Sequence, residues 1–174
     1  MAIVISQNLY IAIAAGSVLP LTHARICYQT HLDDAIISAS NAGDSGHPVG
    51  NILTTQTFET YKAATFPATL IDFDLGVAQS VDYVAMVGKN ISSFNLTYST
   101  DGITYLPISA LSDASKVAKI GLFDAVTARY WRLSVGGENN GFNIANIKLG
   151  LALAMYRPIY GGHTPVTLGR ATVK

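Results

Sequence analysis

Two carboxylates separated by one residue are the clearest candidates for acid–base chemistry in this sequence. Asp72 and Asp74 lie in the alternating run L-I-D-F-D-L, so a β-strand would place both side chains on one face, roughly 7 Å apart. That separation lies between the carboxylate spacings of retaining and inverting glycosidases, which makes a glycosidase one hypothesis. The alternation has a simpler explanation, because the polar positions of a half-buried strand face solvent. We favour this second interpretation and predict no catalytic residues and no enzymatic activity.

Histidine and cysteine do not form the patterns that bind metals. The four histidines, His23, His31, His47 and His163, lack the spacing of metal ligands, and each is expected in a loop or at the surface. Cys27 is the only cysteine, so an internal disulfide is excluded, and we expect it to be a small buried hydrophobic residue. No nucleophile elbow or glycine-rich phosphate loop occurs. We therefore predict no metal and no cofactor.

Short runs with strand periodicity predict an antiparallel β-sandwich, or jelly roll, around these residues. Leu70–Leu75 alternates apolar and polar positions, whereas Val81–Val87 is almost continuously apolar, as in a strand that is covered on both faces. We expect two strands here, separated by a short turn at Gly76–Ser80. Arg129–Val135 predicts another strand, with Trp131 facing the same interior as Phe73 and Val87. A further alternating run is made by Ile147, Leu149, Leu151, Leu153 and Met155.

The stretch Phe94–Tyr105 predicts a β-hairpin. Its dipeptide Asp101-Gly102 is typical of a two-residue type I′ turn, in which both residues have positive φ. Such a turn would place two pairs of residues opposite each other: Thr100 with Ile103, and Tyr98 with Tyr105.

The predicted loops contain the candidate binding residues. Ser40–Pro48 is a loop by composition, and residues 51–61 predict a short helical turn or structured loop crossing one end of the sandwich. Rigid scaffolds commonly present binding residues on such loops, and flat rings and amides suit the rings and hydroxyls of sugars. The candidate ligand-binding residues are Phe58, Tyr61, Asn139, Asn140 and Phe142. Phe142 has an alternative role as a plug at the end of the sandwich.

The composition limits the kinds of partner that the chain can have. Of 174 residues, 49% are hydrophobic and only 13% charged, and the net charge is zero. We therefore expect neither nucleic-acid binding nor attraction to an anionic membrane. The first 24 residues contain no charged side chain but fit neither a signal peptide nor a transmembrane segment. We predict an N-terminal arm at 1–22, a sandwich at 23–155 and a C-terminal arm at 156–174.

An ordered series of short motifs resembles the discoidin family, also called coagulation factor F5/8 type C. In chain order they are L-I-D-F-D-L-G (70–76), V-D-Y-V-A-M-V-G (81–88), Y-S-T-D-G-I-T-Y (98–105), A-R-Y-W-R-L (128–133) and I-A-N-I-K-L-G (144–150). The resemblance covers residues 50–150 and implies a galactose-binding-like jelly roll. Two features depart from the family pattern. Its usual cysteine pair is reduced to Cys27, and the loop that often carries a calcium-binding Asp-Gly reads N-I-L-T-T at 51–55.

The flanks resemble virion proteins of tailed bacteriophages, on the motifs H-A-R-I-C-Y-Q (23–29), N-I-L (51–53) with Thr57 and Tyr61, and Y-R-P-I-Y-G-G-H-T-P (156–165). This resemblance implies a structural subunit of the tail or baseplate, assembled in the host cytoplasm and located in the virion. Its partners would be other virion proteins and further copies of itself, without membrane insertion. The alternative is a carbohydrate-binding module that recognises a cell-surface glycan through the loops at the end of the sandwich.

Overall fold

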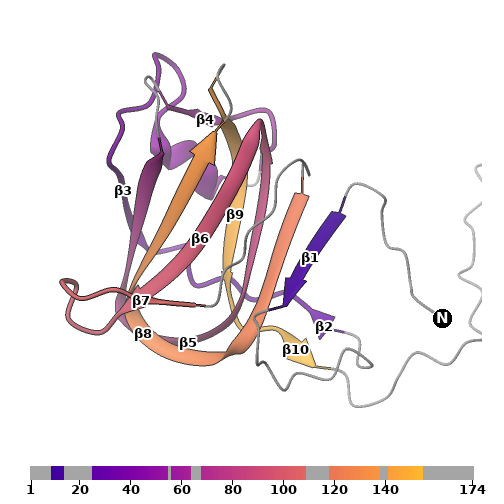
Figure 1. The fold of residues 1–174 in the computed structure, drawn as a ribbon, viewed down its shortest axis with the longest axis vertical. Helices are drawn as coiled ribbons and strands as arrows, with labels where there is room; N and C mark the ends of the chain where they lie inside the picture. Colours follow the sequence, from indigo (N-terminus) through magenta and orange to yellow (C-terminus); the bar gives the residue numbers. More distant parts are fainter. Residues whose placement is uncertain are drawn as a thin grey trace, which may run out of the picture.

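Two long strands pass through both layers of the fold and bend together at one end (Figure 1). The structure is a computed structural model that describes residues 9–13, 25–54, 56–63, 68–108, 118–137 and 141–154. The elements are β1 (Leu9–Ile13), β2 (Arg25–Ile26), β3 (Ile36–Ala39), the 3-10 helix η1 (Val49–Leu53), β4 (Tyr61–Lys62), β5 (Thr69–Lys89), β6 (Ile91–Ser99), β7 (Leu106–Pro107), β8 (Ala118–Gly137), β9 (Asn143–Gly150) and β10 (Leu153–Ala154).

The sheet order confirms the predicted β-sandwich. One layer contains β3, the first part of β5, the last part of β8, and then β6 and β7. The other layer contains β4, β9, the last part of β5 and the first part of β8. All of these neighbours are antiparallel, whereas β1 joins the second layer by pairing in parallel with β8. The two layers are therefore made from one sheet that folds over on itself.

The predicted turn at Gly76–Ser80 is wrong, because β5 continues through it as a single strand. Both parts of β5 pair with β8 rather than with each other, and the register shifts between Asp74 and Gln79. Gly76 has a φ of 76°, which side chains disfavour, so it permits the bend locally. Because β8 bends alongside, the hydrogen bonding resumes beyond the corner.

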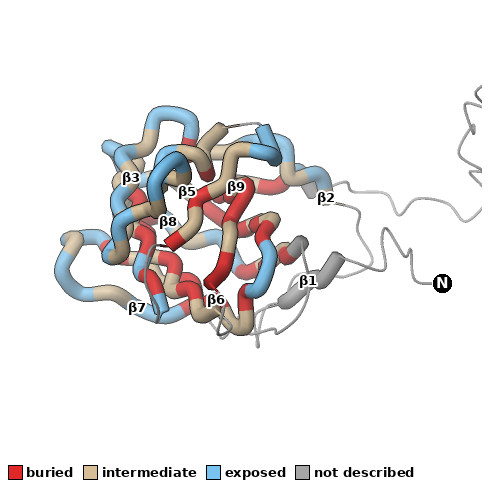
Figure 2. Tube along the Cα trace, turned by 90° about the horizontal axis from the view of Figure 1, so that it is seen from above, coloured by how far each residue is buried: buried red, intermediate tan, exposed pale blue. Residues whose placement is uncertain are grey.

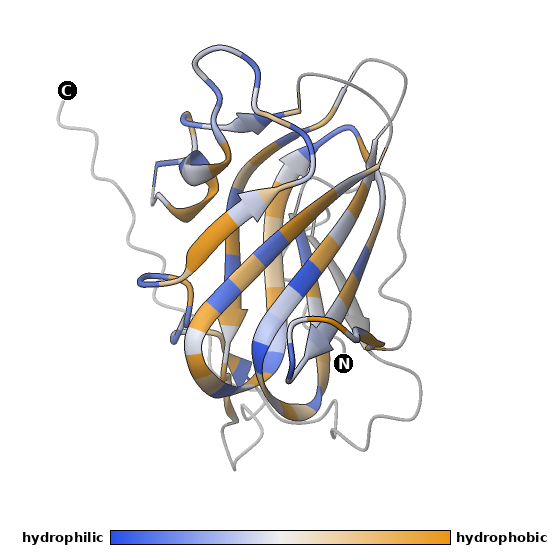
Figure 3. Ribbon diagram, turned by 90° about the vertical axis from the view of Figure 1, so that its left-hand side faces the viewer, coloured by the Kyte–Doolittle hydropathy of each residue, from blue (hydrophilic) through white to orange (hydrophobic). Residues whose placement is uncertain are grey.

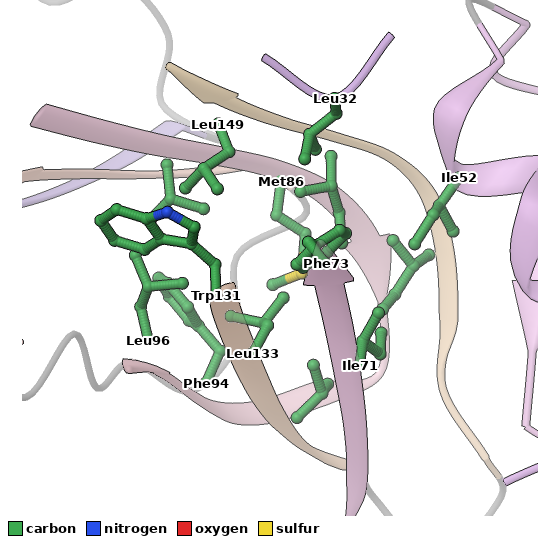
Figure 4. Packing of buried hydrophobic residues seen from close by; sticks show 14 of the residues in the cluster. Leu32, Ile52, Ile71, Phe73, Met86, Phe94, Leu96, Trp131, Leu133 and Leu149 are labelled. Carbon is green, nitrogen blue, oxygen red and sulfur yellow. The ribbon is translucent and has the colours of Figure 1, made fainter. Parts of the chain in front are cut away.

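The core lies between the two layers (Figure 2), and Trp131 is among its fully buried residues (Figure 4). Trp131 on β8 is fully buried and lies directly opposite Phe73 on β5, as predicted. Val87 was expected to share this interior, but it is only half-buried, and its neighbour Met86 points into the core. Figure 3 shows the underlying alternation of apolar and polar residues along the strands.

The turn after β6 is longer than the sequence predicts. Gly102 has a positive φ of 75°, which confirms one half of the prediction, but Asp101 does not share it. Instead, the Asp101 carboxylate accepts hydrogen bonds from the backbone N–H groups of Ile103 and Thr104, both at 2.8 Å. The strand pairing then places Tyr98 opposite Leu106, not opposite Tyr105. The side chain of Asp101 stabilises a wider loop that a two-residue turn cannot form.

A buried carboxylate on β5 contacts the chain segments at β2 and next to β10. Asp82 accepts a hydrogen bond from the Ala152 N–H at 2.7 Å and lies 3.7 Å from the guanidinium of Arg25. Burial raises the pKa of this carboxyl group. Nearby, Cys27 is half-buried rather than fully buried, and burial raises the pKa of its thiol.

Several boundaries differ from the predicted ones. The alternating run after Ile147 ends as β9 at Gly150, and Leu153 is 51% exposed because it lies in the separate β2–β10 pair. Of residues 51–61, predicted as a short helical turn or structured loop, only 51–53 are helical, as part of η1, and Tyr61 already belongs to β4. Within the predicted N-terminal arm, the structure describes only the backbone of β1, and the C-terminal arm at 156–174 lies outside the described residues. No helix in the described part of the chain could span a membrane.

Candidate functional site

Loops from both layers meet at the end of the sandwich opposite the β5–β8 bend (Figure 1). We call this surface the loop end, and it consists of the described residues in 40–48, 54–63, 89–91 and 141–143. Strand pairing places Asn143 on β9 between Lys62 on β4 and Lys89 on β5. The side chain of Asn90 joins two loops by donating a hydrogen bond to the Gly141 carbonyl at 3.2 Å. The loop end is therefore cross-connected by the strands beneath it.

The loop 40–48 is fixed onto β4 by backbone hydrogen bonds. The Asp44 N–H donates to the Lys62 carbonyl at 2.8 Å, and the Lys62 N–H donates to the His47 carbonyl at 3.4 Å. Within the loop, the His47 N–H donates to the Asp44 carbonyl at 2.8 Å. These bonds hold the side chains of Asp44, His47 and Lys62 on one well-defined frame.

Four residues form what we call the polar cluster of the loop end: Asp44, His47, Thr60 and Lys62. The Lys62 Nζ donates to Asp44 Oδ2 at 3.0 Å, and the two side chains remain 41% and 45% exposed. The hydrogen bond from Lys62, with another from the Ser45 N–H, holds the pKa of Asp44 below its ordinary value. The Asp44 carboxyl group is therefore held in its charged form near neutral pH, and both side chains can reach solvent.

The ring of His47 is anchored to Thr60 through Nδ1. This nitrogen lies 3.1 Å from the Thr60 carbonyl oxygen and 3.2 Å from the Thr60 hydroxyl oxygen. The imidazole can donate or accept hydrogen bonds according to its tautomer. The polar cluster thus combines a carboxylate acceptor and an ammonium donor with an imidazole. Such a set can bind hydroxyl groups in either direction.

The structure separates the residues that were predicted to bind a ligand. Phe58 is 78% exposed and lies two residues before Thr60, so its ring is available to a ligand. Tyr61 and Phe142 have exposures of only 0% and 1%, and their rings meet edge to face with centroids 6.2 Å apart. Asn139 and Asn140 lie outside the described residues.

The burial of Tyr61 and Phe142 corrects their predicted role and has a physical reason. Tyr61 pairs with Ile144 across β4 and β9, which directs its ring into the core. Its hydroxyl donates to the Asn41 carbonyl at 2.9 Å and so supports the loop from beneath. Phe142 fills the end of the sandwich, in agreement with the alternative role considered for it. Neither ring offers a face to a ligand.

Sequence reasoning missed the polar cluster because its members come together only through the fold. Asp44 and Lys62 are 18 positions apart, and they meet because the loop doubles back onto β4. His47 was taken as a loop or surface residue because it lacks the spacing of a metal ligand. The only signal in the sequence was the loop composition of Ser40–Pro48, which placed a possible site in the right region.

The carboxylate pair on β5 is part of an ionic ladder on the outer face of the first layer. Arg132 donates to Asp72 at 2.6 and 3.1 Å, and Arg129 donates to Asp74 at 2.7 and 2.8 Å. The guanidinium of Arg132 also stacks on the ring of Tyr105 at 3.9 Å. The bonds from Arg129 lower the pKa of Asp74, so this group is held as a carboxylate and not as a general acid.

Within the described residues, no group of three or more His, Cys, Asp and Glu side chains is arranged to hold a metal ion. The ion pairs among these residues each join side chains from different strands or loops. The polar cluster and the exposed ring of Phe58 are therefore the features best suited to contact an external ligand.

Comparison with solved structures identifies the fold. A pectin-binding carbohydrate-binding module is 25% identical, with a TM-score of 0.58 over 69% of this chain and 92% of that one. The chitosan-binding module 1 of a chitosanase/glucanase from Paenibacillus sp. IK-5 is 16% identical, with a TM-score of 0.63 over 70% and 98%. The CBM32-5 module of Clostridium perfringens, in complex with GalNAc-β-1,3-galactose, is 13% identical, with a TM-score of 0.63 over 71% and 100%. The chain has their discoidin-like, galactose-binding fold.

By sequence, neither a protein-family model nor a curated protein matches the chain. The fold expected from the resemblance to the discoidin family is confirmed. The interpretation of the chain as a structural subunit of a bacteriophage virion is wrong, because these structural neighbours are carbohydrate-binding modules and nothing links the chain to virion proteins.

Proposed function

We propose that the chain is a carbohydrate-binding module that recognises a glycan through its loop end. The observation that carries the proposal is the likeness to three modules of this kind, each of which is matched over at least 92% of its own length. The sandwich of this chain thus corresponds to a whole binding module and not to a fragment of one. The ligands of these three modules, which are pectin, chitosan and GalNAc-β-1,3-galactose, are all carbohydrates.

The chemistry of the loop end supports the proposal independently. A sugar presents hydroxyl groups at its edge, and these can donate to Asp44 or His47 and accept from Lys62. A sugar ring also has an apolar face, which packs on an exposed aromatic ring such as that of Phe58. A few convergent polar groups beside an aromatic surface are typical of sites that orient small polar ligands.

The test is a glycan array probed with the full chain, followed by titration calorimetry on the strongest hit. We expect Phe58→Ala and Lys62→Gln to weaken binding at least about tenfold, as removal of a charged hydrogen bond or a stacked ring does. Asp74→Asn is the matched control, because its ion pair with Arg129 lies near the β5–β8 bend, at the other end of the sandwich. A chain that binds no glycan on the array, while folded by circular dichroism, would overturn the proposal.

We propose no catalytic step for this domain. The one pair of carboxylates that could have served a glycosidase, Asp72 and Asp74, is occupied by two arginines on β8. The absence of enzymatic activity stays a prediction, and assays of the glycans bound on the array for hydrolysis would test it. The predicted association with further copies of the chain and the predicted virion localisation are untested.

A further inference from the structure

We propose that the ligand of the loop end is an uncharged sugar, held by two neighbouring hydroxyl groups that bridge Asp44 and Lys62. This inference rests on the proposed function and adds the class of ligand to it. The class is not implied by the fold, because modules with the same fold include one that binds pectin and one that binds chitosan.

The balance of charge at the loop end favours a neutral ligand. Its described residues include two acidic side chains, Asp44 and Glu59, and two basic ones, Lys62 and Lys89. The carboxylate and ammonium of the polar cluster already neutralise each other at 3.0 Å. An acidic sugar would have to compete with Asp44 for Lys62 while being repelled by Asp44, and a cationic sugar would meet the converse problem with Lys62. The pair therefore discriminates against ligands of either charge.

The geometry of the pair suits two adjacent hydroxyls. A hydroxyl group both donates and accepts, whereas a carboxylate only accepts and an ammonium only donates. One sugar hydroxyl can therefore donate to Asp44 while its neighbour accepts from Lys62, and the ion pair need not be broken. His47 Nε2 adds another hydrogen-bonding atom on the same loop frame, because it is Nδ1 that contacts Thr60. Charged hydrogen bonds to neutral hydroxyls would then orient the sugar.

The first experiment compares neutral, acidic and cationic oligosaccharides on the same array, including lactose, tetragalacturonate and fully deacetylated chitotetraose. We expect hits among neutral sugars, with a Kd that changes less than about twofold between about 50 and about 500 mM NaCl, because no net charge is neutralised on binding. Binding confined to the acidic or the cationic probes would overturn this inference and leave the proposed function intact. The absence of any hit would overturn the proposed function itself.

The second experiment shifts the net charge of the site in opposite directions with two variants. Asp44→Asn keeps the acceptor oxygen that receives the Ser45 N–H but leaves Lys62 unpaired, so it should lose about tenfold in affinity for the neutral sugar and gain salt-sensitive binding of tetragalacturonate. Lys62→Gln should lose a similar factor and gain binding of chitotetraose. A purely structural role for the pair would weaken binding without these opposite changes in preference. Unchanged neutral binding in both variants, with Asp74→Asn as control, would overturn the inference.

Discussion

Trp131 is the residue on which most of the core depends. Its indole is fully buried, donates to the Ala128 carbonyl at 3.2 Å, and has ring-centroid distances of 5.9 Å to Tyr98 and 6.2 Å to Phe123. Both neighbouring strands of its layer supply core residues at the same level, since Trp131 lies opposite Phe73 on β5 and Tyr98 on β6. A smaller side chain at this position would leave a cavity shared by three strands.

Trp131→Ala should therefore lower the free energy of unfolding by about 3–5 kcal/mol, the range for aromatic residues removed from a core. Urea denaturation followed by circular dichroism measures the change. Trp131→Phe is the control and should lose less, because most of the ring volume remains. Since Trp131 is the only tryptophan, iodide quenching of the native protein offers a second check, and ready quenching would contradict the buried placement.

Asp101 makes the loop between β6 and β7 sensitive to acid. Its carboxylate accepts hydrogen bonds from two backbone N–H groups and from the Ser99 hydroxyl, which lowers its pKa to about 2. Because the pKa is lower in the folded state than in the unfolded state, the stabilisation is complete above the ordinary value near 4 and is lost as the pH falls toward 2. Protonation weakens the acceptor for these three hydrogen bonds, all of which reach the same oxygen, Oδ1.

The melting temperature of the wild type should thus fall more steeply between about pH 4 and about pH 2 than that of Asp101→Asn, because the amide has no proton to gain. At pH 7 the variant should be the less stable of the two, since an amide oxygen is a weaker acceptor than a carboxylate. Differential scanning calorimetry across this range gives both comparisons. Parallel curves for the two proteins would show that the turn does not depend on the charge of Asp101.

At the scale of elements, the bend in β5 is the feature that turns one sheet into two layers. Gly76 has a positive φ and open space around its Cα, so a side chain there would meet backbone strain but no steric clash. Gly76→Val should cost about 1–2 kcal/mol from the left-handed conformation alone. Gly50→Ala is the matched control, because that glycine also has open space but no positive φ. Chemical denaturation that finds the two variants equally stable would contradict a strained bend.

Strands are predicted well from the sequence where apolar and polar residues alternate along a flat part of the sheet. They are predicted less well where tertiary contacts decide the direction of the chain. The alternation of Ile71 and Phe73 with Asp72 correctly indicated which side faces the core. Gly76–Ser80 has the composition of a turn, and no local pattern tells a turn from a bend that keeps its hydrogen-bonding partner. That distinction depends on β8, whose paired residues lie about 50 positions away.

The candidate site shows the same limit for a different reason. The loops were located correctly from their glycine, asparagine and proline content. The orientation of their side chains was not predicted. Tyr61 was taken as a binding residue because aromatic rings in loops suit sugars, yet its pairing with Ile144 directs it inward. Asp44 and Lys62 have no periodic relation in the sequence, so their ion pair follows only from the tertiary path of the loop.

At the scale of the whole molecule, the two layers cannot be separated without breaking the strands that they share. Phe73 and Met86 lie in different layers but on the same strand, and Leu133 and Phe123 are related in the same way on β8. The core between the layers is one continuous cluster, so opening one layer would expose apolar surface on both. Neither layer has a core of its own with which to stay folded.

The described sandwich should therefore unfold as a single cooperative unit. In native-state hydrogen exchange, the amides of Leu133 in one layer and of Ile147 in the other should report the same free energy of opening, equal to the global value of about 5–15 kcal/mol that is usual for such domains. Gly76→Val should lower both by the same amount, because the bend belongs to both layers. The amides of Ile103 and Thr104, in the exposed loop after β6, should exchange at lower free energy and serve as an internal reference. Two distinct values for the layers, or a variant that lowers only one of them, would mean that β5 and β8 do not couple the layers, and the bend would then be a hinge between independent units.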